Sequence, residues 1–389
     1  MKELTILMPC LNEAKTIGAC VEDAWKLIKE QGIDGEVLVS DNGSSDGSQA
    51  IASGFGARVI NCSIRGYGAA LQYGIQQAAG SIVLMGDSDR SYHFDEAMPM
   101  IESLRSGHDV CMGSRLRGHI EPGAMPLLNR YIGNPVLTAI GRRFFHVPLT
   151  DFHCGMRAFR KDKILELDLV TTGMEWASEM VIKAQMAGLK MTEVPITLHK
   201  DGRSRPPHLR RWRDGWRHLR FMLLHAPTWL FTVPGMAMAI AGLLGVAVLS
   251  RGMVALGGVR LDVHSLLVMA FLLILGVQIA FSGLFARVYS SLHGILPYDT
   301  KFDHAVRRLT LEKLLVLSLV LGALGAASFM HTFWGWRTAH FADLDIQTTM
   351  RQLIPALTLI AVSVQSIFNG FMLSILFLKT KRSKPVPLP

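Results

Sequence analysis

The pattern of hydrophobic and polar positions changes near residue 225. Before that point, short apolar runs alternate with longer helix-like stretches. After it, four long runs contain no Asp, Glu, Lys or Arg: 229–250, 266–286, 314–336 and 352–378. A helix of about 20 uncharged residues can cross a hydrocarbon layer of roughly 30 Å. We therefore expect transmembrane helices at about 229–250, 266–287, 314–335 and 353–378, and we exclude a purely soluble protein.

The N-terminal part alternates between predicted strands and predicted helices. Strands are expected at 4–10, 36–40, 57–61, 81–86 and 109–113, and helices at 13–30, 66–79 and 95–106. Short links between them indicate a Rossmann-like α/β domain with a mostly parallel sheet covered by helices. In such a sheet, ligands bind beyond the carboxyl ends of the strands.

Polar clusters follow three of these strands. They are Pro9-Cys10-Leu11-Asn12-Glu13, the run 41–47 (Asp-Asn-Gly-Ser-Ser-Asp-Gly) and Asp87-Ser88-Asp89. Taken singly, each has a structural explanation: a helix cap, a turn or a solvated loop. Their recurrence at three strand ends favours one shared ligand site.

The residue types of these clusters indicate a nucleotide-diphosphate ligand. Asp87 and Asp89 can direct carboxylate oxygens toward one divalent cation, which would neutralise a leaving diphosphate. Asp41 can accept hydrogen bonds from a base or ribose. Gly66 and Gly68 open a predicted helix with little bulk, which suits a nearby phosphate or sugar.

These motifs resemble family 2 glycosyltransferases of the polyprenyl-phosphate sugar synthase branch, which includes dolichol-phosphate mannose and glucose synthases. The resemblance rests on the three clusters, on Gly66-x-Gly68-x-Ala70 and on Asp151-x-x-Cys154-Gly155-x-Arg157-x-Phe159. It implies a GT-A fold, a nucleotide-diphospho-sugar donor, Mg²⁺ or Mn²⁺, and inversion at the anomeric carbon. It assigns the metal to Asp87 and Asp89. Donor contacts are expected at Pro9, Asn12, Glu13, Asp41, Asn42, Gly66, Gly68 and Asp87.

The sequence departs from the family pattern at two places. Asn42 stands where the family often has Asp, and Arg90-Ser91 stand where it often has Leu-Gln. The second difference removes a glutamine side chain next to the expected metal site.

A basic segment precedes the first predicted span. Residues 200–225 carry eight Lys and Arg against two Asp, interleaved with Trp212 and Trp216. This indicates an interfacial helix with arginines, among them Arg203 and Arg205, near an anionic lipid phosphate. A cluster that only orients the chain in the membrane is the alternative. Nucleic-acid binding is not expected, because a basic patch that adjoins a span belongs to membrane attachment.

A second arginine-rich region, 115–143, contains Arg115, Arg117 and Arg130 around an apolar stretch. It is interpreted either as a groove for the acceptor phosphate or as solvated surface helices. Arg115 and Arg130 match arginines that bind the acceptor phosphate in the family.

A phosphate acceptor needs little help with proton transfer, because a phosphate monoester is mostly dianionic at neutral pH. The expected reaction is the inverting transfer of one sugar, from UDP-glucose first or GDP-mannose second, to a polyprenyl phosphate. Asp89 and Asp151 are expected nearest the reacting carbon. The rival interpretations are a processive polysaccharide synthase and a non-catalytic membrane scaffold. The segment His208-Leu209-Arg210-Arg211-Trp212 lacks the glutamine of the Gln-x-x-Arg-Trp motif that processive synthases carry.

The distribution of charge predicts orientation. Of the formal net charge of +9, the segment 200–225 supplies +6. The loop after the second span and the tail carry nine Lys and Arg, against four in the other two loops, so the N-terminal domain and both termini are expected in the cytoplasm. No signal peptide is recognised. We expect a multi-pass protein of the cell membrane that can form a homo-oligomer. Its expected parts are a catalytic domain (1–199), a basic juxtamembrane segment (200–227), a transmembrane domain (228–380) and a cytoplasmic tail (381–389).

Cysteine and histidine spacing predicts no metal site. The five cysteines, all before residue 155, form no CxxC pair and are expected to be reduced and mostly buried. His153, His199 and His293 show no metal-ligand spacing and are interpreted as structural.

Overall fold

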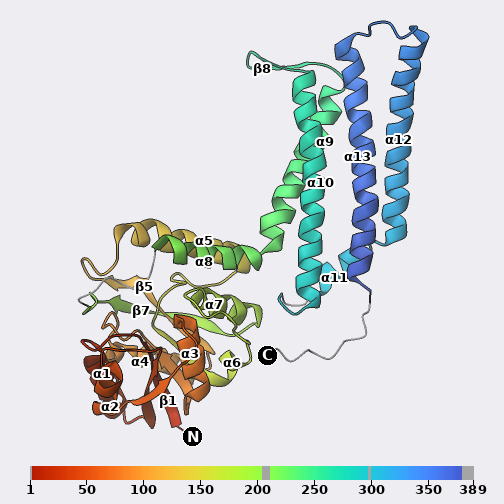
Figure 1. Ribbon diagram of the computed structural model, residues 1–389. Helices are drawn as coiled ribbons and strands as arrows, with labels where there is room; N and C mark the ends of the chain where they lie inside the picture. Colours follow the sequence, from red (N-terminus) through yellow and green to blue (C-terminus); the bar gives the residue numbers. More distant parts are fainter. Residues whose placement is uncertain (1, 204–210, 297–298, 379–389) are drawn as a thin grey trace. The chain divides into compact units, whose positions relative to one another are not determined.

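The computed structural model describes residues 2–203, 211–296 and 299–378 (Figure 1). The chain forms two compact units, Met1–Leu224 and His225–Pro389.

The first unit is built on a seven-stranded sheet with the order β3-β2-β1-β4-β6-β5-β7. All neighbouring strands are parallel except β6, which runs antiparallel to β4 and β5. The five predicted strands are present, and β6 and β7 are additional. The strands are β1 (Lys2–Cys10), β2 (Gly35–Asp41), β3 (Arg58–Asn61), β4 (Gly80–Met85), β5 (Val110–Ile120), β6 (Arg157–Arg160) and β7 (Met191–Leu198). The predicted α/β class with a mostly parallel sheet is confirmed.

Helices cover both faces of this sheet. One core contains Ile17 and Val21 of α1 and Met100 of α4, and the other contains Leu71 of α3, Trp176 of α7 and Met222 of α8. The helices are α1 (Ile17–Glu30), α2 (Ser48–Gly54), α3 (Tyr67–Gln77), α4 (Met98–Arg105), α5 (Asn134–Phe145), α6 (Lys161–Leu165), α7 (Trp176–Met186) and α8 (Arg211–Leu224). A 3₁₀ turn, η1 (Phe94–Ala97), precedes α4, and a π turn, η2 (Asn129–Gly133), precedes α5.

The first helix begins later than its sequence pattern predicts. Asn12 has a φ of 58°, in the left-handed region, and residues 14–16 form a turn before α1 begins at Ile17. Asparagine tolerates this conformation better than most residues. The chain between β1 and α1 is therefore a loop that can carry side chains into a ligand site.

The second unit contains four helices long and apolar enough to cross a membrane among the residues that the structure describes. They are α9 (Val233–Leu249), which the π turn η3 (Thr228–Thr232) precedes, α10 (Val263–Leu292), α12 (Leu311–Thr338) and α13 (Ile346–Leu376). A hairpin of β8 (Val254–Leu256) and β9 (Val259–Leu261) joins α9 to α10. The sequence predicted a purely helical unit, and this hairpin is the exception to it. The short helix α11 (Thr300–Arg307) lies between α10 and α12.

Small residues allow close approach of α9 and α10. A Cβ atom on Gly235 would lie 2.5 Å from the backbone nitrogen of Ala280, and one on Gly276 would lie 2.3 Å from that of Ala239. Helices in lipid commonly pack through such small residues. Between α12 and α13, the Ser363 hydroxyl donates to the carbonyl of Ser318 at 2.6 Å.

Candidate active site

Asp41 lies at the carboxyl end of β2 and is almost completely buried, with 1% of its surface exposed. Its Oδ2 accepts hydrogen bonds from the amides of Gly43 and Ser44, both at 2.9 Å, and from the Gln49 side chain at 2.7 Å. Its Oδ1 is buried and has no hydrogen-bond partner among the described residues. A buried acceptor without a partner is costly, so this oxygen is suited to a ligand donor such as a base N–H.

Hydrogen bonds join the loop after β1 to the loop after β2. Asn12 Oδ1 accepts from the amide of Ser45, and the amide of Asn12 donates to the Ser44 hydroxyl, both at 2.8 Å. The amide of Glu13 donates to the Ser48 hydroxyl at 2.8 Å. The loops that carry Asn12, Glu13 and Asp41 are therefore joined to each other, which brings two of the three polar clusters together.

Asn42 and the two helix-opening glycines have internal roles. Asn42 Nδ2 donates to the carbonyl of Ile64 at 2.7 Å, and Asn42 Oδ1 accepts from the amide of Gly66 at 2.7 Å. A Cβ on Gly66 would lie 2.1 Å from the Thr172 carbonyl, and one on Gly68 would lie 2.6 Å from the Cβ of Trp176. The chain itself fills the space beside both glycines, so their contact with a donor stays a prediction.

Asp87 and Asp89 follow β4, whose end lies beside that of β1. The Tyr67 hydroxyl donates to Asp87 Oδ1 at 3.0 Å. Asp89 Oδ1 accepts from the amide of Ser91 at 2.9 Å and from the Ser91 hydroxyl. Desolvation and the negative charge of Asp89 raise the pKa of Asp87 to about 6. The loop is anchored to β1 because the Ser88 hydroxyl donates to the Pro9 carbonyl at 2.8 Å.

Arg203 joins a predicted donor residue, Glu13, to a predicted metal ligand, Asp89. Its Nε lies 2.9 Å from Glu13 Oε1, and its Nη2 lies 3.0 Å from Asp89 Oδ2. Its side chain is only 16% exposed. The sequence predicted Arg203 beside the acceptor phosphate, whereas the structure places it against the donor and metal residues.

Arg115 forms an ion pair with Asp151. The sequence around neither residue reveals this contact. Arg115 Nε lies 2.7 Å from Asp151 Oδ2, and its Nη2 lies 2.8 Å from Oδ1. Burial alone would raise the pKa of Asp151, but the charge and hydrogen bonds of Arg115 outweigh it and lower that pKa. The positive charge of Arg115 opposes the rise in the pKa of Asp87, so the two side chains are close enough to interact electrostatically. The position of Asp151 next to the reacting carbon stays a prediction.

The other predicted arginines have different partners. Arg117 Nη1 lies 3.1 Å from Glu193 Oε1, with the arginine side chain 54% exposed. Arg130 lies in η2, with its guanidinium 5.6 Å from the ring centroid of Tyr131. Arg205 lies outside the described residues.

Helices α5 and α8 lie side by side in the first unit (Figure 1). On and around them, large apolar side chains are exposed next to arginines, which we call the interfacial surface. Its exposed apolar residues are Leu127, Leu128, Tyr131, Ile132, Val136, Trp212, Trp216 and Leu224. An amphipathic surface with tryptophan and arginine is typical of contact with a lipid interface.

Sequence reasoning missed two residues that shape the carboxylate site. Gly155 leaves room for Asp87, because a Cβ there would lie 2.6 Å from Asp87 Oδ2. The Tyr92 hydroxyl accepts a hydrogen bond from the Gly155 amide at 3.1 Å and so fixes that loop. Gly155 lies in the motif 151–159, but its contact with Asp87 depends on strand β6, which was not predicted.

The carboxylate site fits a divalent cation. Two aspartates follow β4 in close succession, and burial first, then the negative charge of Asp89, raises the pKa of Asp87. Oxygen ligands of this kind suit Mg²⁺ or Mn²⁺. All five cysteines are buried and free, as predicted. We therefore do not consider their thiols as ligands of this cation.

Two family models match this chain. Residues 5–167 match the glycosyl transferase family 2 domain, and residues 284–377 match the glycosyltransferase family 2 C-terminal transmembrane region. A low-salt glycan biosynthesis hexosyltransferase, Agl6 of Haloferax volcanii, is 36% identical over 373 residues, which cover 95% of this chain and 88% of that relative. The dolichyl-phosphate hexose transferase of the same organism is 29% identical over 195 residues, 50% of this chain and 82% of that relative.

Solved structures similar to this chain include glucosyl-3-phosphoglycerate synthase from Mycobacterium tuberculosis in complex with Mn²⁺, UDP-glucose and phosphoglyceric acid. It is 19% identical, with a TM-score of 0.47, and the match covers 57% of this chain and 79% of that chain. The full-length similarity to the Haloferax hexosyltransferase and the two matched regions identify the family. The chain belongs to glycosyltransferase family 2 and is a membrane glycosyltransferase with the C-terminal transmembrane region of that family.

Proposed function

We propose that this glycosyltransferase transfers one sugar, with inversion, from a nucleotide-diphospho-sugar to a polyprenyl phosphate at the cytoplasmic face of the membrane. UDP-glucose is the first candidate donor and GDP-mannose the second. The observation that carries the proposal is the convergence of the Asp87–Asp89 pair and the unpartnered Asp41 oxygen at the carboxyl ends of β1, β2 and β4.

The nucleotide is assigned to the joined loops after β1 and β2. Asp41 Oδ1 would accept a base N–H, a donor that both uracil and guanine offer. Oδ2 is already held by the backbone of its own loop, so the carboxylate is oriented before the donor binds. This orientation reduces the entropy that binding would otherwise cost.

Asp87 and Asp89 would hold Mg²⁺ or Mn²⁺, which stabilises the negative charge of the departing nucleoside diphosphate. We assign Arg203 to the same diphosphate, because its guanidinium already lies against Glu13 and Asp89. A guanidinium can make two parallel hydrogen bonds to phosphate oxygens.

Arg115 is assigned to the acceptor phosphate and Asp151 to the positioning of Arg115. The paired carboxylate fixes the plane and direction of the guanidinium. A phosphate monoester is mostly dianionic at neutral pH, so the acceptor oxygen needs no dedicated base. The enzyme then contributes charge and position, which offset the repulsion between two anionic substrates.

A lipid acceptor agrees with two further observations. The interfacial surface exposes tryptophan and leucine on the unit that carries the site. A relative of this chain is named a dolichyl-phosphate hexose transferase. An acceptor phosphate at the headgroup level of the membrane would be within reach of such a surface.

The test is incubation of the purified full-length chain with short polyprenyl phosphates and a panel of labelled UDP- and GDP-sugars, with and without Mg²⁺. We expect one nucleotide sugar to give a lipid that carries a single labelled sugar, only with the metal present. A labelled polymer would contradict the proposal and support a processive synthase. Absence of metal-dependent binding of any nucleotide sugar in calorimetry would support the non-catalytic scaffold.

A further inference from the structure

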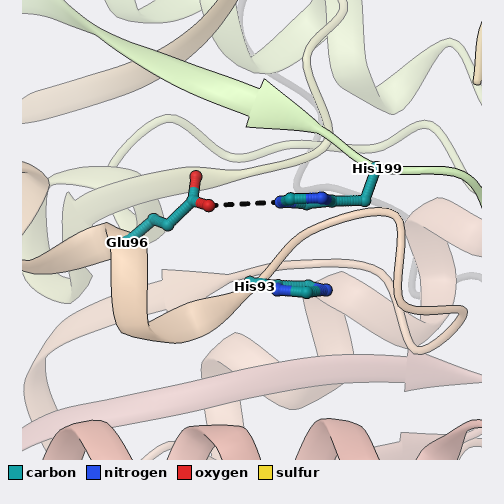
Figure 2. A group of neighbouring side chains, drawn as sticks. All are labelled: His93, Glu96 and His199. Atoms are coloured by element: carbon teal, nitrogen blue, oxygen red, sulfur yellow. Dashed lines mark hydrogen bonds and ion pairs between the residues drawn. The ribbon is translucent and has the colours of Figure 1, made fainter. Parts of the chain in front are cut away.

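A second group of potential metal ligands lies outside the candidate active site. His93, Glu96 and His199 each offer a ligand atom, and these atoms all lie within 4.8 Å of one another. Figure 2 shows the two imidazole rings stacked, with the Glu96 carboxylate pointing to the edge of His199. The ring centroids are 3.9 Å apart, and Glu96 Oε1 lies 3.2 Å from His199 Nε2.

One of the distances between the ligand atoms suits a tetrahedral ion, and another requires a side chain to move. Ligand bonds of about 2.0–2.1 Å place two ligand atoms of a tetrahedral Zn²⁺ roughly 3.3 Å apart. The His199–Glu96 separation of 3.2 Å already meets this requirement. His93 has to turn its half-buried ring to bring one nitrogen closer, since the stacked arrangement does not aim both rings at one point.

A second carboxylate provides independent support for a ligand role of His199. Glu121 Oε1 lies 2.9 Å from His199 Nδ1, the nitrogen that faces away from Glu96. Glu121 is itself held in place, because the amide of Lys200 donates to its Oε2 at 3.0 Å. Histidines that bind metals commonly donate their other ring N–H to a carboxylate, which fixes the tautomer and leaves the first nitrogen free for the ion.

We propose that His93, Glu96 and His199 bind a divalent transition-metal ion, with Zn²⁺ as the preferred ion and Glu121 as the carboxylate that orients His199. Two imidazoles and one carboxylate favour Zn²⁺ over Mg²⁺, which prefers an all-oxygen environment. Three protein ligands leave a fourth position for water. The zinc site does not depend on the proposed sugar transfer.

An ion bound at this site would hold two segments of the chain together. The amide of His199 donates to the Ser91 carbonyl at 3.0 Å, and the amide of Gly202 donates to the Asp89 carbonyl at 2.9 Å. Zinc would therefore reinforce an existing link between the Asp87–Asp89 loop and the segment that ends in Arg203. This consequence, unlike the site, rests on the proposed function.

The test is calorimetric titration of Zn²⁺ into the full-length chain, purified without a polyhistidine tag and stripped with a chelator, in the absence of nucleotide sugar. We expect one tight site per chain. The substitutions His93→Ala and His199→Ala should each weaken it by at least about 100-fold, and Glu121→Gln by about 10–100-fold. Co²⁺ in place of Zn²⁺ should give the strong visible absorption of a tetrahedral complex.

Two control variants make the result decisive. Asp89→Asn should keep the zinc site, because Asp89 belongs to the other metal site, and His108→Ala should keep it because His108 lies elsewhere. Thermal unfolding without zinc shows whether each variant folds as the parent does. If an alanine variant of the site does not fold, His93→Gln is tested in its place. Absence of zinc binding to the parent at micromolar concentrations overturns the proposal. So does zinc binding that survives in folded His93 and His199 variants, or that disappears in Asp89→Asn.

Discussion

Arg115 and Asp151 make a two-point ion pair in the candidate active site, with N–O distances of 2.7 and 2.8 Å. The Asp151 side chain is fully buried and that of Arg115 is 10% exposed. Both carboxylate oxygens are taken up by this arginine, and the Arg115 amide donates to Oδ2 as well, at 3.1 Å. Asp151 is therefore best understood as a residue that positions Arg115.

Replacement Asp151→Asn should impair acceptor use more than donor use. The change leaves the Arg115 charge without its buried partner, so the guanidinium loses its fixed direction. We expect a higher KM for polyprenyl phosphate, an almost unchanged KM for the nucleotide sugar, and a loss of about 3–5 kcal/mol of stability. Steady-state kinetics with each substrate varied in turn, together with thermal unfolding, measures these effects.

The matched control is Arg117→Gln, on the same strand. The Arg117 side chain is 54% exposed and its partner Glu193, only 6% exposed, also accepts hydrogen bonds from Thr150, so the loss of Arg117 should cost less stability than the loss of the buried Arg115–Asp151 pair. Equal losses of stability in Asp151→Asn and Arg117→Gln would refute the distinction between these two ion pairs.

Asp89→Asn should abolish sugar transfer even at high Mg²⁺. The substitution removes one of the two proposed metal carboxylates and one of the two ion-pair partners of Arg203, while it keeps the shape of the side chain. A loss of turnover of at least about 10²–10³-fold is expected for this part of the transition-state electrostatics. The assay is transfer of labelled sugar to polyprenyl phosphate at several Mg²⁺ concentrations.

Asp95→Asn is the control for that experiment. Asp95 lies in η1 and makes a 3.7 Å ion pair with Lys26, with both side chains largely exposed. We expect the activity of the parent in this variant. Substantial turnover by Asp89→Asn would remove the basis of the metal assignment.

Gly155→Ala tests whether the room around Asp87 matters. The added methyl group would lie 2.6 Å from Asp87 Oδ2 and 3.0 Å from the Tyr92 ring, so the carboxylate has to move. We expect weaker metal-dependent binding of the nucleotide sugar in calorimetry. Gly54→Ala is the control, since a Cβ there meets nothing within 4 Å. Parent-like binding by Gly155→Ala would show that Asp87 tolerates displacement.

The sequence was sufficient for the parts of the fold that local pattern determines. Apolar runs located β1 to β5, and uncharged runs located α9, α10, α12 and α13. Strand β6 escaped prediction because it has four residues and pairs antiparallel between two strands distant in sequence. Its place in the sheet depends on tertiary contacts, which single-sequence patterns do not report.

The candidate site likewise combines residues that local sequence indicates with contacts that depend on the tertiary fold. Asp41, Asp87 and Asp89 could be proposed as site residues because each lies at or soon after the carboxyl end of a strand. The partners of Arg203 and Arg115 could not be identified in this way, since Glu13 is 190 residues from Arg203 and Asp151 is 36 from Arg115. The His93–His199 stack likewise spans two segments that no local spacing connects.

Acid should destabilise the first unit through two histidines, one on each side of the Ser178 hydroxyl. His153 Nε2 lies 3.0 Å from the Ser178 hydroxyl, and His218 Nδ1 lies 2.8 Å from it. Burial lowers the pKa of His153 well below its ordinary value and that of His218 to about 4. The unfolded chain therefore binds more protons below a pH of about 6.5, so stability is complete above that pH and falls as the pH decreases.

The shift at His218 alone predicts a loss of about 2 kcal/mol between pH 7 and pH 5. The measurement is the thermal unfolding midpoint at both pH values for the parent and for His218→Gln, which keeps a polar group near Ser178. We expect the parent midpoint to fall by several degrees and the variant midpoint to fall less. An identical fall in both would exclude this histidine as a source of acid sensitivity.

The charge bias of the loops predicts that the β8–β9 hairpin lies outside the cytoplasm and the first unit inside. Arg260 in β9 and Ser53 in α2 are both exposed, and the five native cysteines are buried. In intact cells, a membrane-impermeant maleimide should therefore label Arg260→Cys but not Ser53→Cys. Ser53→Cys should react only after the membrane is permeabilised. The reverse pattern would place the site on the outer face, where nucleotide sugars are scarce, and would contradict both the orientation and the proposed donor.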